Sequence, residues 1–217
     1  TGKPSPFYVN GGKGSKIYDI DGNTYIDYWC GAGPVILGHA HPDVNKAVIS
    51  AIESGNVQFS IPSALETELM AKLVDHIPCA EKGIFSTAGS DALAFAARIA
   101  RPYTNRPRLA KFEGGYQGWS DELAVSNAPD FSKAGTKKQP NTVPDSAGVS
   151  IDTNKQTLVL PYNDIATTEL LLTKEKHNVS CVIVEPMIHG NNLMPAEGFL
   201  QRLRDICSKL GIVLIFD

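Results

Sequence analysis

The stretch GFLQRLRDICSKLGIVLIFD, residues 198–217, decides the fold. Apolar residues recur at helical spacing from Phe199 to Leu210, which predicts an amphipathic helix. Gly211 stands where a left-handed residue ends such a helix, and five apolar residues then lead to Asp217 without alternation, as in a buried parallel strand. Ligands of open parallel sheets bind beyond the carboxyl ends of the strands, so we expect Asp217 to face a ligand. The alternative is an ordinary capping or loop Asp.

Helical and strand patterns alternate along the rest of the chain, which predicts an α/β fold with a mostly parallel central sheet flanked by helices. Residues 18–28 predict a β-hairpin around an Asp-Gly turn. Residues 127–154, rich in Pro, Ser, Thr, Lys and Gly, predict a long surface loop of the kind that often serves as a lid. The expected helices are Pro42–Glu53, Ala64–Ile77, Ala92–Ala100 (ending near Pro102) and a helix from an Asp164 cap to His177; the expected strands are Gly83–Ser86, Arg108–Phe112, Leu158–Leu160, Ser180–Val184 and a short one at Ala124–Val125.

Composition bounds the class of protein. The chain has 217 residues with 42% hydrophobic content, enough for a sizeable core, and its 20 basic and 23 acidic residues give a net charge of −3. With no basic stripe, neither nucleic acid nor an anionic membrane surface is indicated as a partner. No apolar run is long enough to cross a bilayer, and no signal-peptide pattern occurs at Thr1. Because the chain starts without Met and ends in mid-motif, we expect it to be a piece of a longer protein.

Two residue types could indicate metal or redox sites. The four cysteines, at positions 30, 79, 181 and 207, form no CxxC pair and lie in or near apolar runs, which predicts reduced, mostly buried thiols in a cytoplasmic protein. His39 and His41 lack further ligands at suitable spacing, so an ordered loop before a helix is favoured over a zinc site. We therefore expect no metal.

A candidate anion site follows the expected strand Gly83–Ser86. Gly89 and Ser90 lie in a turn of small residues that leads directly into a helix that is apolar nearly all round and therefore expected to be buried. The free N–H groups at a helix N-terminus and the helix dipole favour a phosphate, Gly89 lets a ligand approach the backbone, and Ser90 offers a hydroxyl. The alternative is an ordinary capped helix with Ser90 as its N-cap.

Two further candidates follow other strands. Tyr116 lies among glycines in FEGGYQG, residues 112–118, where its ring could stack on a flat heteroaromatic group. Glu185 ends the expected strand Ser180–Val184. A phosphate site, a stacking ring and a buried carboxylate at the strand ends of one sheet suit pyridoxal 5'-phosphate (PLP), whose ring nitrogen needs an anionic partner.

The chain resembles the class III aminotransferases of PLP fold type I, and within them the glutamate-1-semialdehyde aminomutase-like branch. The resemblance spans nearly the whole sequence. It is carried, in the family's order, by YDIDGNTYIDY, GPVILGHAHPDV, FSTAGSDALAFAARIAR, FEGGYQG, LPYND, VIVEP and the opening stretch of residues 198–217.

The resemblance implies roles for the candidate residues. Gly89 and Ser90 would hold the phosphate, Tyr116 would cover one face of the ring, and Asp217 would pair with the ring nitrogen and keep it protonated. Glu185 would orient residues that contact the cofactor. Gln117 stands at a cofactor-site position where the family usually has His. The Schiff-base lysine lies beyond the strand-end Asp in the family, hence beyond Asp217. None of the lysines present matches its motif.

Departures from the family's pattern concern the substrate side. Gly31-Ala32 stands where the aminomutases tend to have Ser-Trp, and His189-Gly190 stands where they have Gly-Asn, although Asn191 could compensate. We assign Gly31, Ala32 and Asn191 to the substrate side. These departures favour a two-substrate transamination between an amine or amino acid and a keto acid or aldehyde over the alternative, the aminomutase reaction.

Alternatives from other classes are a non-catalytic α/β ligand-binding protein and a dinucleotide-dependent enzyme. The latter is disfavoured because no G-x-G-x-x-G follows a strand. The resemblance implies that residues 1–50 belong with a small domain and that residues 51–217 form the first part of the large PLP domain. It also implies a homodimer with shared active sites, with Gly31–Pro34 and Gln58–Pro62 buried against the partner.

Overall fold

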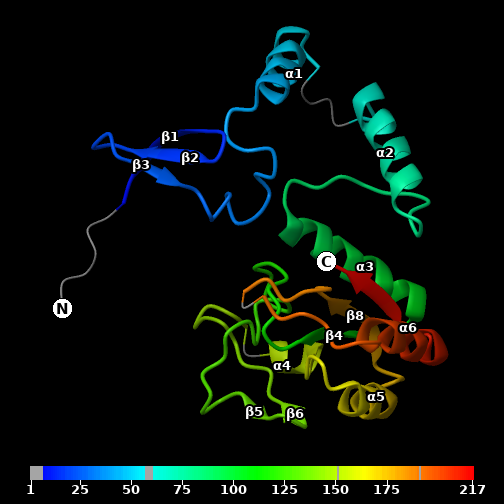
Figure 1. The fold of residues 1–217 in the computed structure, drawn as a ribbon. Helices are drawn as coiled ribbons and strands as arrows, with labels where there is room; N and C mark the ends of the chain where they lie inside the picture. The colour runs from blue at the N-terminus through cyan, green and yellow to red at the C-terminus, as the bar shows by residue number, and fades with distance from the viewer. Residues whose placement is uncertain (1–6, 57–60, 151, 191) are drawn as a thin grey trace, which may run out of the picture. The chain divides into compact units, whose positions relative to one another are not determined.

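The computed structural model describes residues 7–56, 61–150, 152–190 and 192–217. The chain divides into two compact units, Thr1–Lys82 and Gly83–Asp217, which are described separately (Figure 1). The two units divide after Lys82, whereas the predicted boundary between the small-domain segment and the PLP domain follows residue 50. The predicted domain assignment concerns the full-length protein and remains a prediction. Of the segment predicted to be buried against a partner, Gln58, Phe59 and Ser60 lie outside the described residues.

The first unit contains a three-stranded antiparallel sheet and two helices. Its strands β1 (Val9–Lys13), β2 (Lys16–Asp19) and β3 (Thr24–Ile26) lie side by side in chain order. The Asp19 carboxylate accepts the backbone N–H groups of Asp21 and Asn23, which closes the predicted hairpin turn. The helices are α1 (Pro42–Glu53) and α2 (Ala64–His76), the latter begun by a capping box between Ser63 and Glu66. The hairpin and both helices were predicted correctly; β1 was not predicted.

The second unit is built on a four-stranded, wholly parallel sheet. Its strands are β4 (Arg108–Phe112), β7 (Thr157–Leu160), β8 (Val179–Val184) and β9 (Val213–Phe216), in the order β7-β4-β8-β9. All six residues of β8 are buried, as expected for a central parallel strand covered on both faces. The predicted α/β class and parallel sheet are confirmed.

Helices cover both faces of this sheet (Figure 1). The first face packs against α3 (Gly89–Thr104) through a cluster that includes Leu93, Ala97 and Leu109. The opposite face packs against α5 (Ile165–Lys174) and α6 (Phe199–Leu210). Gly211 ends α6 in the left-handed conformation with φ 62°, as predicted. The sheet is thus the middle of three layers, and packing on both of its faces fixes the carboxyl ends of its strands along one edge.

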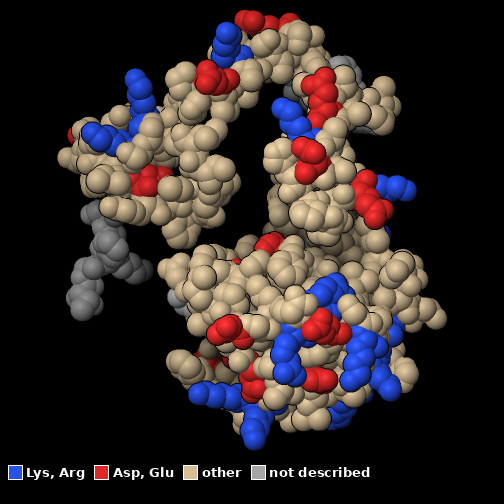
Figure 2. All heavy atoms as spheres, turned by 45° about the vertical axis from the view of Figure 1, so that its right-hand side comes forward, with Lys and Arg blue, Asp and Glu red and all other residues tan. Residues whose placement is uncertain are grey.

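The remaining elements of the second unit are short. Residues 127–150 form most of the predicted long loop, with a small hairpin of β5 (Gly135–Thr136) and β6 (Gln139–Pro140) inside it. The short helix α4 (Thr153–Gln156) leads into β7. Within the described ranges, no helix is long and apolar enough to span a membrane. On the face seen in Figure 2, acidic and basic side chains are interspersed over the second unit rather than segregated by sign.

Five predictions about elements need correction. Gly83–Ser86 is no strand: Ile84 is 68% exposed, and no described strand pairs with the segment. Ala124–Val125 forms only an isolated bridge, from Val125 to Pro144. Helix α3 begins three residues before Ala92 and continues through Pro102 to Thr104, and α5 ends at Lys174 rather than near His177. Helix α3 also exposes one side, including Ile99 at 62%, so it is not buried all round.

Candidate functional site

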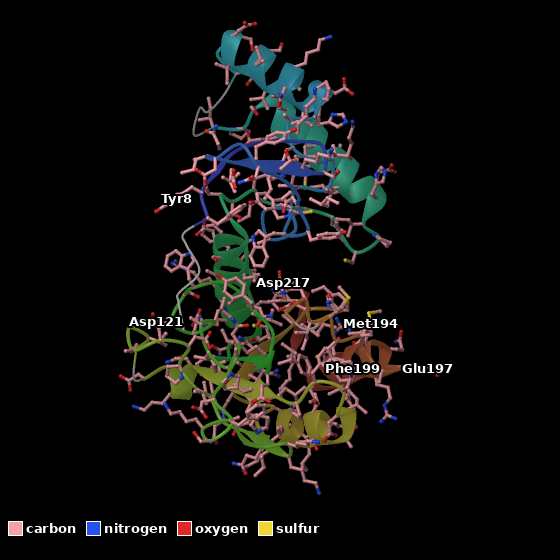
Figure 3. The ribbon with its side chains drawn as sticks, turned by 60° about the vertical axis from the view of Figure 1, so that its left-hand side comes forward. Tyr8, Asp121, Met194, Glu197, Phe199 and Asp217 are labelled. Carbon is pink, nitrogen blue, oxygen red and sulfur yellow. The ribbon has the colours of Figure 1, made fainter. Side chains whose placement is uncertain are left out.

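The candidate site lies at the carboxyl edge of the parallel sheet. Glu185 directly follows β8 and Asp217 directly follows β9, and the strands are in register with Val184 opposite Phe216. The backbone N–H of Asp217 donates to the carbonyl of Val184 at 3.0 Å, which extends the ladder to the two acids. Figure 3 labels Asp217 beyond the end of β9. Strand pairing therefore brings two carboxylates, 32 positions apart in the sequence, to one place.

The N-terminus of α3 provides an anion-binding end for this site. Ala88, and not Ser90, is the N-cap residue, and it makes no side-chain capping hydrogen bond. In the described part of the chain, the N–H groups of Gly89 and Ser90 have no protein acceptor. Ser90 is the second residue of the helix, so the N-cap alternative for it is wrong. Two free N–H groups and a hydroxyl at the start of a 16-residue helix suit a phosphate.

The loop after β4 approaches this helix start closely. A Cβ placed on Gly118 would lie 2.7 Å from Ser90 Oγ and 2.8 Å from Ser90 Cα, and Gly118 has φ +97°. Only glycine accommodates both that conformation and that contact. The predicted phosphate residues and the FEGGYQG loop are thus brought together.

Glu185 organises the same loop from the other side. Its Oε1 accepts the backbone N–H of Tyr116 at 2.7 Å, and its Oε2 accepts the backbone N–H of His189 at 3.1 Å. The His189 ring places Nδ1 2.6 Å from the same Oε2 and lies edge-on to the Tyr116 ring, with centroids 6.4 Å apart. Tyr116 itself is 47% exposed, which leaves part of the residue accessible to a ligand.

Gln117 turns away from the exposed side of the loop. It is 1% exposed, and its Nε2 donates to Glu185 Oε1 at 2.9 Å. Its Oε1 is buried without a hydrogen-bond partner in the described structure. Gln117 therefore acts on the site through Glu185.

The two ionisable groups at the centre of this edge have shifted pKa values. Partial burial raises the pKa of the Asp217 carboxyl, and nearby Glu185 raises it further, while His189 and Lys111 oppose the shift. Burial lowers the pKa of Lys111 to about 8. A carboxylate whose charge is disfavoured in this way gains most from a cationic neighbour, such as a protonated ring nitrogen.

Three residues of this edge were missed as site residues. Lys111 is fully buried in β4, Gly118 contacts Ser90, and His189 contacts Glu185. For Lys111 a signal was present, since it is the one charged residue inside the apolar end LAKF of a strand pattern, residues 109–112. The Gly118–Ser90 contact joins two distant segments, and the His189–Glu185 contact forms in the loop after β8, where neither helix nor strand periodicity applies.

The remaining predicted residues belong to the first unit or lie outside the described residues. Gly31 and Ala32 belong to the first unit, in a turn where both have φ +64°. Asn191 lies outside the described residues. His39 binds Asp27 Oδ2 at 2.7 Å in an ordered loop before α1, as predicted. Among the residues that the structure describes, no cluster of His, Cys, Asp or Glu suits a metal ion.

The residues present fit a flat, phosphorylated ring with a basic nitrogen. The uncapped α3 terminus and Ser90 suit the phosphate. The Gly118 backbone lies against Ser90 without a Cβ, which would otherwise occupy the space beside the Ser90 hydroxyl. Tyr116 offers a ring face, and Asp217 offers a carboxylate. These are the groups through which a protein holds PLP.

Comparison with known proteins gives the same result. The sequence model of the family Aminotransferase class-III matches residues 1–217. A glutamate-1-semialdehyde 2,1-aminomutase of Citrifermentans bemidjiense is 42% identical over 98% of this chain, and one of Thermodesulfovibrio yellowstonii is 43% identical over 98%. The chain spans 48% of the length of each.

Solved structures agree with the sequence matches. An omega-transaminase from Sphaerobacter thermophilus superposes on the whole chain with a TM-score of 0.92 and 38% identity, and the match covers 49% of that protein. A glutamate-1-semialdehyde aminomutase from Pseudomonas aeruginosa PAO1 superposes on 98% of the chain with a TM-score of 0.81 and 27% identity, over 45% of its own length. Its K286A variant was solved with PMP, and another similar structure is a transaminase with PLP bound. These matches confirm the predicted PLP fold type and cofactor class, and the chain belongs to the class-III aminotransferase family.

Proposed function

We propose that the full-length protein is a PLP-dependent aminotransferase that moves an amino group between an amine or amino acid and a keto acid or aldehyde. The observation that carries this proposal is the convergence of three groups in the second unit. The α3 terminus with Ser90, the half-exposed Tyr116 ring and the Asp217 carboxylate come from separate segments and meet around one sheet edge.

Each of these residues has a distinct task in the proposed reaction. The bound cofactor supplies an electron sink for the substrate's Cα. The N–H groups of Gly89 and Ser90 bind its phosphate, Tyr116 covers one face of its ring, and Asp217 holds a proton on its ring nitrogen. We place the catalytic lysine beyond Asp217 in the full-length protein.

The alternative reaction is that of glutamate-1-semialdehyde 2,1-aminomutase, an intramolecular amino exchange. It is favoured by six curated relatives at 38–43% identity that carry that name. The omega-transaminase superposition and the departures at Gly31-Ala32 and His189-Gly190 favour transamination, which we propose.

One experiment discriminates between the two reactions. Full-length protein is incubated with PLP and a panel of paired amines and keto acids, and separately with glutamate-1-semialdehyde alone, while amino products are quantified. A transaminase needs both partners, whereas an aminomutase converts the semialdehyde as sole substrate. Efficient conversion of the semialdehyde alone would overturn our choice, and no turnover of any kind would overturn the proposed enzyme class.

We further propose a homodimer with shared active sites in the cytoplasm, acting on small molecules rather than on nucleic acid or membranes. All four cysteines are free thiols, which fits a reducing compartment. Burial raises the pKa of Cys207 to about 12, so that thiol is inert. Cys181 is also buried, whereas Cys79 is exposed and Cys30 is half-buried, so only two of the four match the expected burial.

A further inference from the structure

A buried lysine lies directly beneath the stacking loop. Lys111 is 0% exposed, and its Nζ donates to the backbone carbonyls of Gly115 at 2.8 Å, Leu123 at 3.1 Å and Val125 at 2.6 Å. Lysine is almost never fully buried unless its charge is compensated. Here all three ammonium protons are used, and every acceptor is a backbone carbonyl. Lys111 therefore ties the loop after β4 to residues 123–125.

A buried carboxylate holds the same loop from the other side. Glu185 is 7% exposed, and its Oε1 accepts the Tyr116 N–H at 2.7 Å. Its other oxygen accepts the backbone N–H of His189 at 3.1 Å and lies 2.6 Å from the His189 ring Nδ1, so the carboxylate cannot turn without losing several contacts. Hydrogen bonds with an ionised partner are about twice as strong as neutral ones.

Lys111 and Glu185 act on one and the same peptide group. The carbonyl of Gly115 and the N–H of Tyr116 are the two polar groups of the peptide bond that joins these residues. The ammonium lies at the negative end of that peptide's dipole and the carboxylate at its positive end, so both charges favour one orientation of the plane. Rotation of the plane would break both bonds, and Tyr116 Cα is part of the plane.

We propose that Lys111 and Glu185 form a clamp on the Gly115–Tyr116 peptide that fixes the Tyr116 ring in the position where it covers the cofactor. Both are positioning residues, and Lys111 acts from beneath the loop through the backbone. This inference rests on the proposed function, which supplies the cofactor that the clamped ring would cover. It predicts that removal of the Lys111 ammonium loosens residues 113–118 and reorients Tyr116 without removing any group that contacts the cofactor.

The test compares full-length wild type with Lys111→Met, which keeps the length and removes the charge. Hydrogen exchange of the peptide containing residues 113–118 is followed by mass spectrometry in the cofactor-free protein. The circular dichroism of bound PLP, divided by its absorbance, then reports the asymmetry of the ring's surroundings. We expect exchange in this segment to be at least about tenfold faster in the variant, corresponding to about 1.4 kcal/mol of local protection, and the dichroism ratio to change.

Two variants control for charge and for general stability. Lys209→Met removes an exposed lysine of α6, and Leu172→Ala removes a buried side chain on the opposite face of the sheet. Both should keep the exchange of residues 113–118 and the dichroism ratio of wild type. Glu185→Gln, which removes the carboxylate charge, should loosen the same segment as Lys111→Met.

The two readouts separate failure of the clamp from failure of the proposed function. Wild-type exchange and dichroism in Lys111→Met would overturn the clamp and leave Lys111 a purely structural residue. The same loosening in Leu172→Ala would also overturn it. If wild type bound no PLP, the proposed function would fall, and the exchange measurement would still decide whether the clamp exists.

Discussion

The backbone of Gly118 lies against Ser90, closely enough that a Cβ on Gly118 would be 2.7 Å from Ser90 Oγ. The contact joins the loop after β4 to the N-terminus of α3. It therefore couples the residue that would bind the phosphate to the loop that carries Tyr116.

Gly118→Ala should weaken PLP binding by at least tenfold. The added methyl group meets Ser90 and stands at φ +97°, so the loop or the helix start must shift, at a cost on the order of 1–3 kcal/mol. The dissociation constant is measured by titration of cofactor-free full-length protein. Gly148→Ala is the control, since in the described structure the one atom within 4 Å of an added Cβ there, its chain neighbours aside, is Ser146 Oγ at 3.8 Å. An equal loss of affinity in that variant would contradict the prediction.

Ser90→Ala should weaken PLP affinity more than it slows turnover at saturating cofactor. The hydroxyl contributes one hydrogen bond to a charged group, about 1.5–3 kcal/mol, and takes no part in proton transfer. Retention of PLP during dialysis and kcat are measured side by side. Ser50→Ala in α1 is the control, and wild-type retention in Ser90→Ala would remove Ser90 from the phosphate site.

Asp217→Asn should keep part of the bound PLP but lose most turnover. The amide is nearly isosteric, yet it carries no charge to hold a proton on the ring nitrogen. Turnover within about threefold of wild type, some 0.65 kcal/mol in barrier, would rule out the assigned role. The pH at which bound PLP changes its absorption spectrum should also fall in the variant, because the protonated ring has lost its anionic partner.

Lys111 should make stability depend on pH above 8. Its pKa is about 8 when folded and 10.5 unperturbed, so between these values the unfolded chain binds more protons, and the free energy of unfolding rises with pH. The gain relative to Lys111→Met, which does not titrate, should reach on the order of 3 kcal/mol by pH 10.5. The nearby acids Asp145, Glu185 and Asp217 oppose the lowering of the Lys111 pKa. Urea midpoints of both proteins across this range test the prediction, and a constant difference would contradict it.

The full-length protein should remain a dimer at working concentration. The expectation comes from the family resemblance and from the exposed apolar side chains of the first unit, such as Trp29 at 75% and Ile36 at 87%. Sedimentation velocity and activity are measured over a dilution series. A fully active, PLP-bound monomer would be the contrary result.

Local patterns predicted most of the helices and strands, since their causes lie within a few residues. The bounds of β4 and α1 agree with the prediction because a strand of apolar residues and a Pro-initiated helix are read directly from the sequence. The segment Gly83–Ser86 has the same apolar pattern, yet it forms no strand because strand formation needs a hydrogen-bonded neighbour. The start of α3 was misplaced because Gly89 and Ser90 have low helix propensity, which the helix and its packing override.

The sequence by itself determined the residue types of the site: a small-residue turn before a helix, an aromatic among glycines, and acids at strand ends. Tertiary structure alone decided how these residues are held. Glu185 bonds Tyr116 across 69 positions, and Lys111 reaches the other side of the same peptide. Such contacts depend on the order of strands β4, β8 and β9 in the sheet. Periodicity specifies which face of a strand is buried, but it does not specify which strand lies next to it.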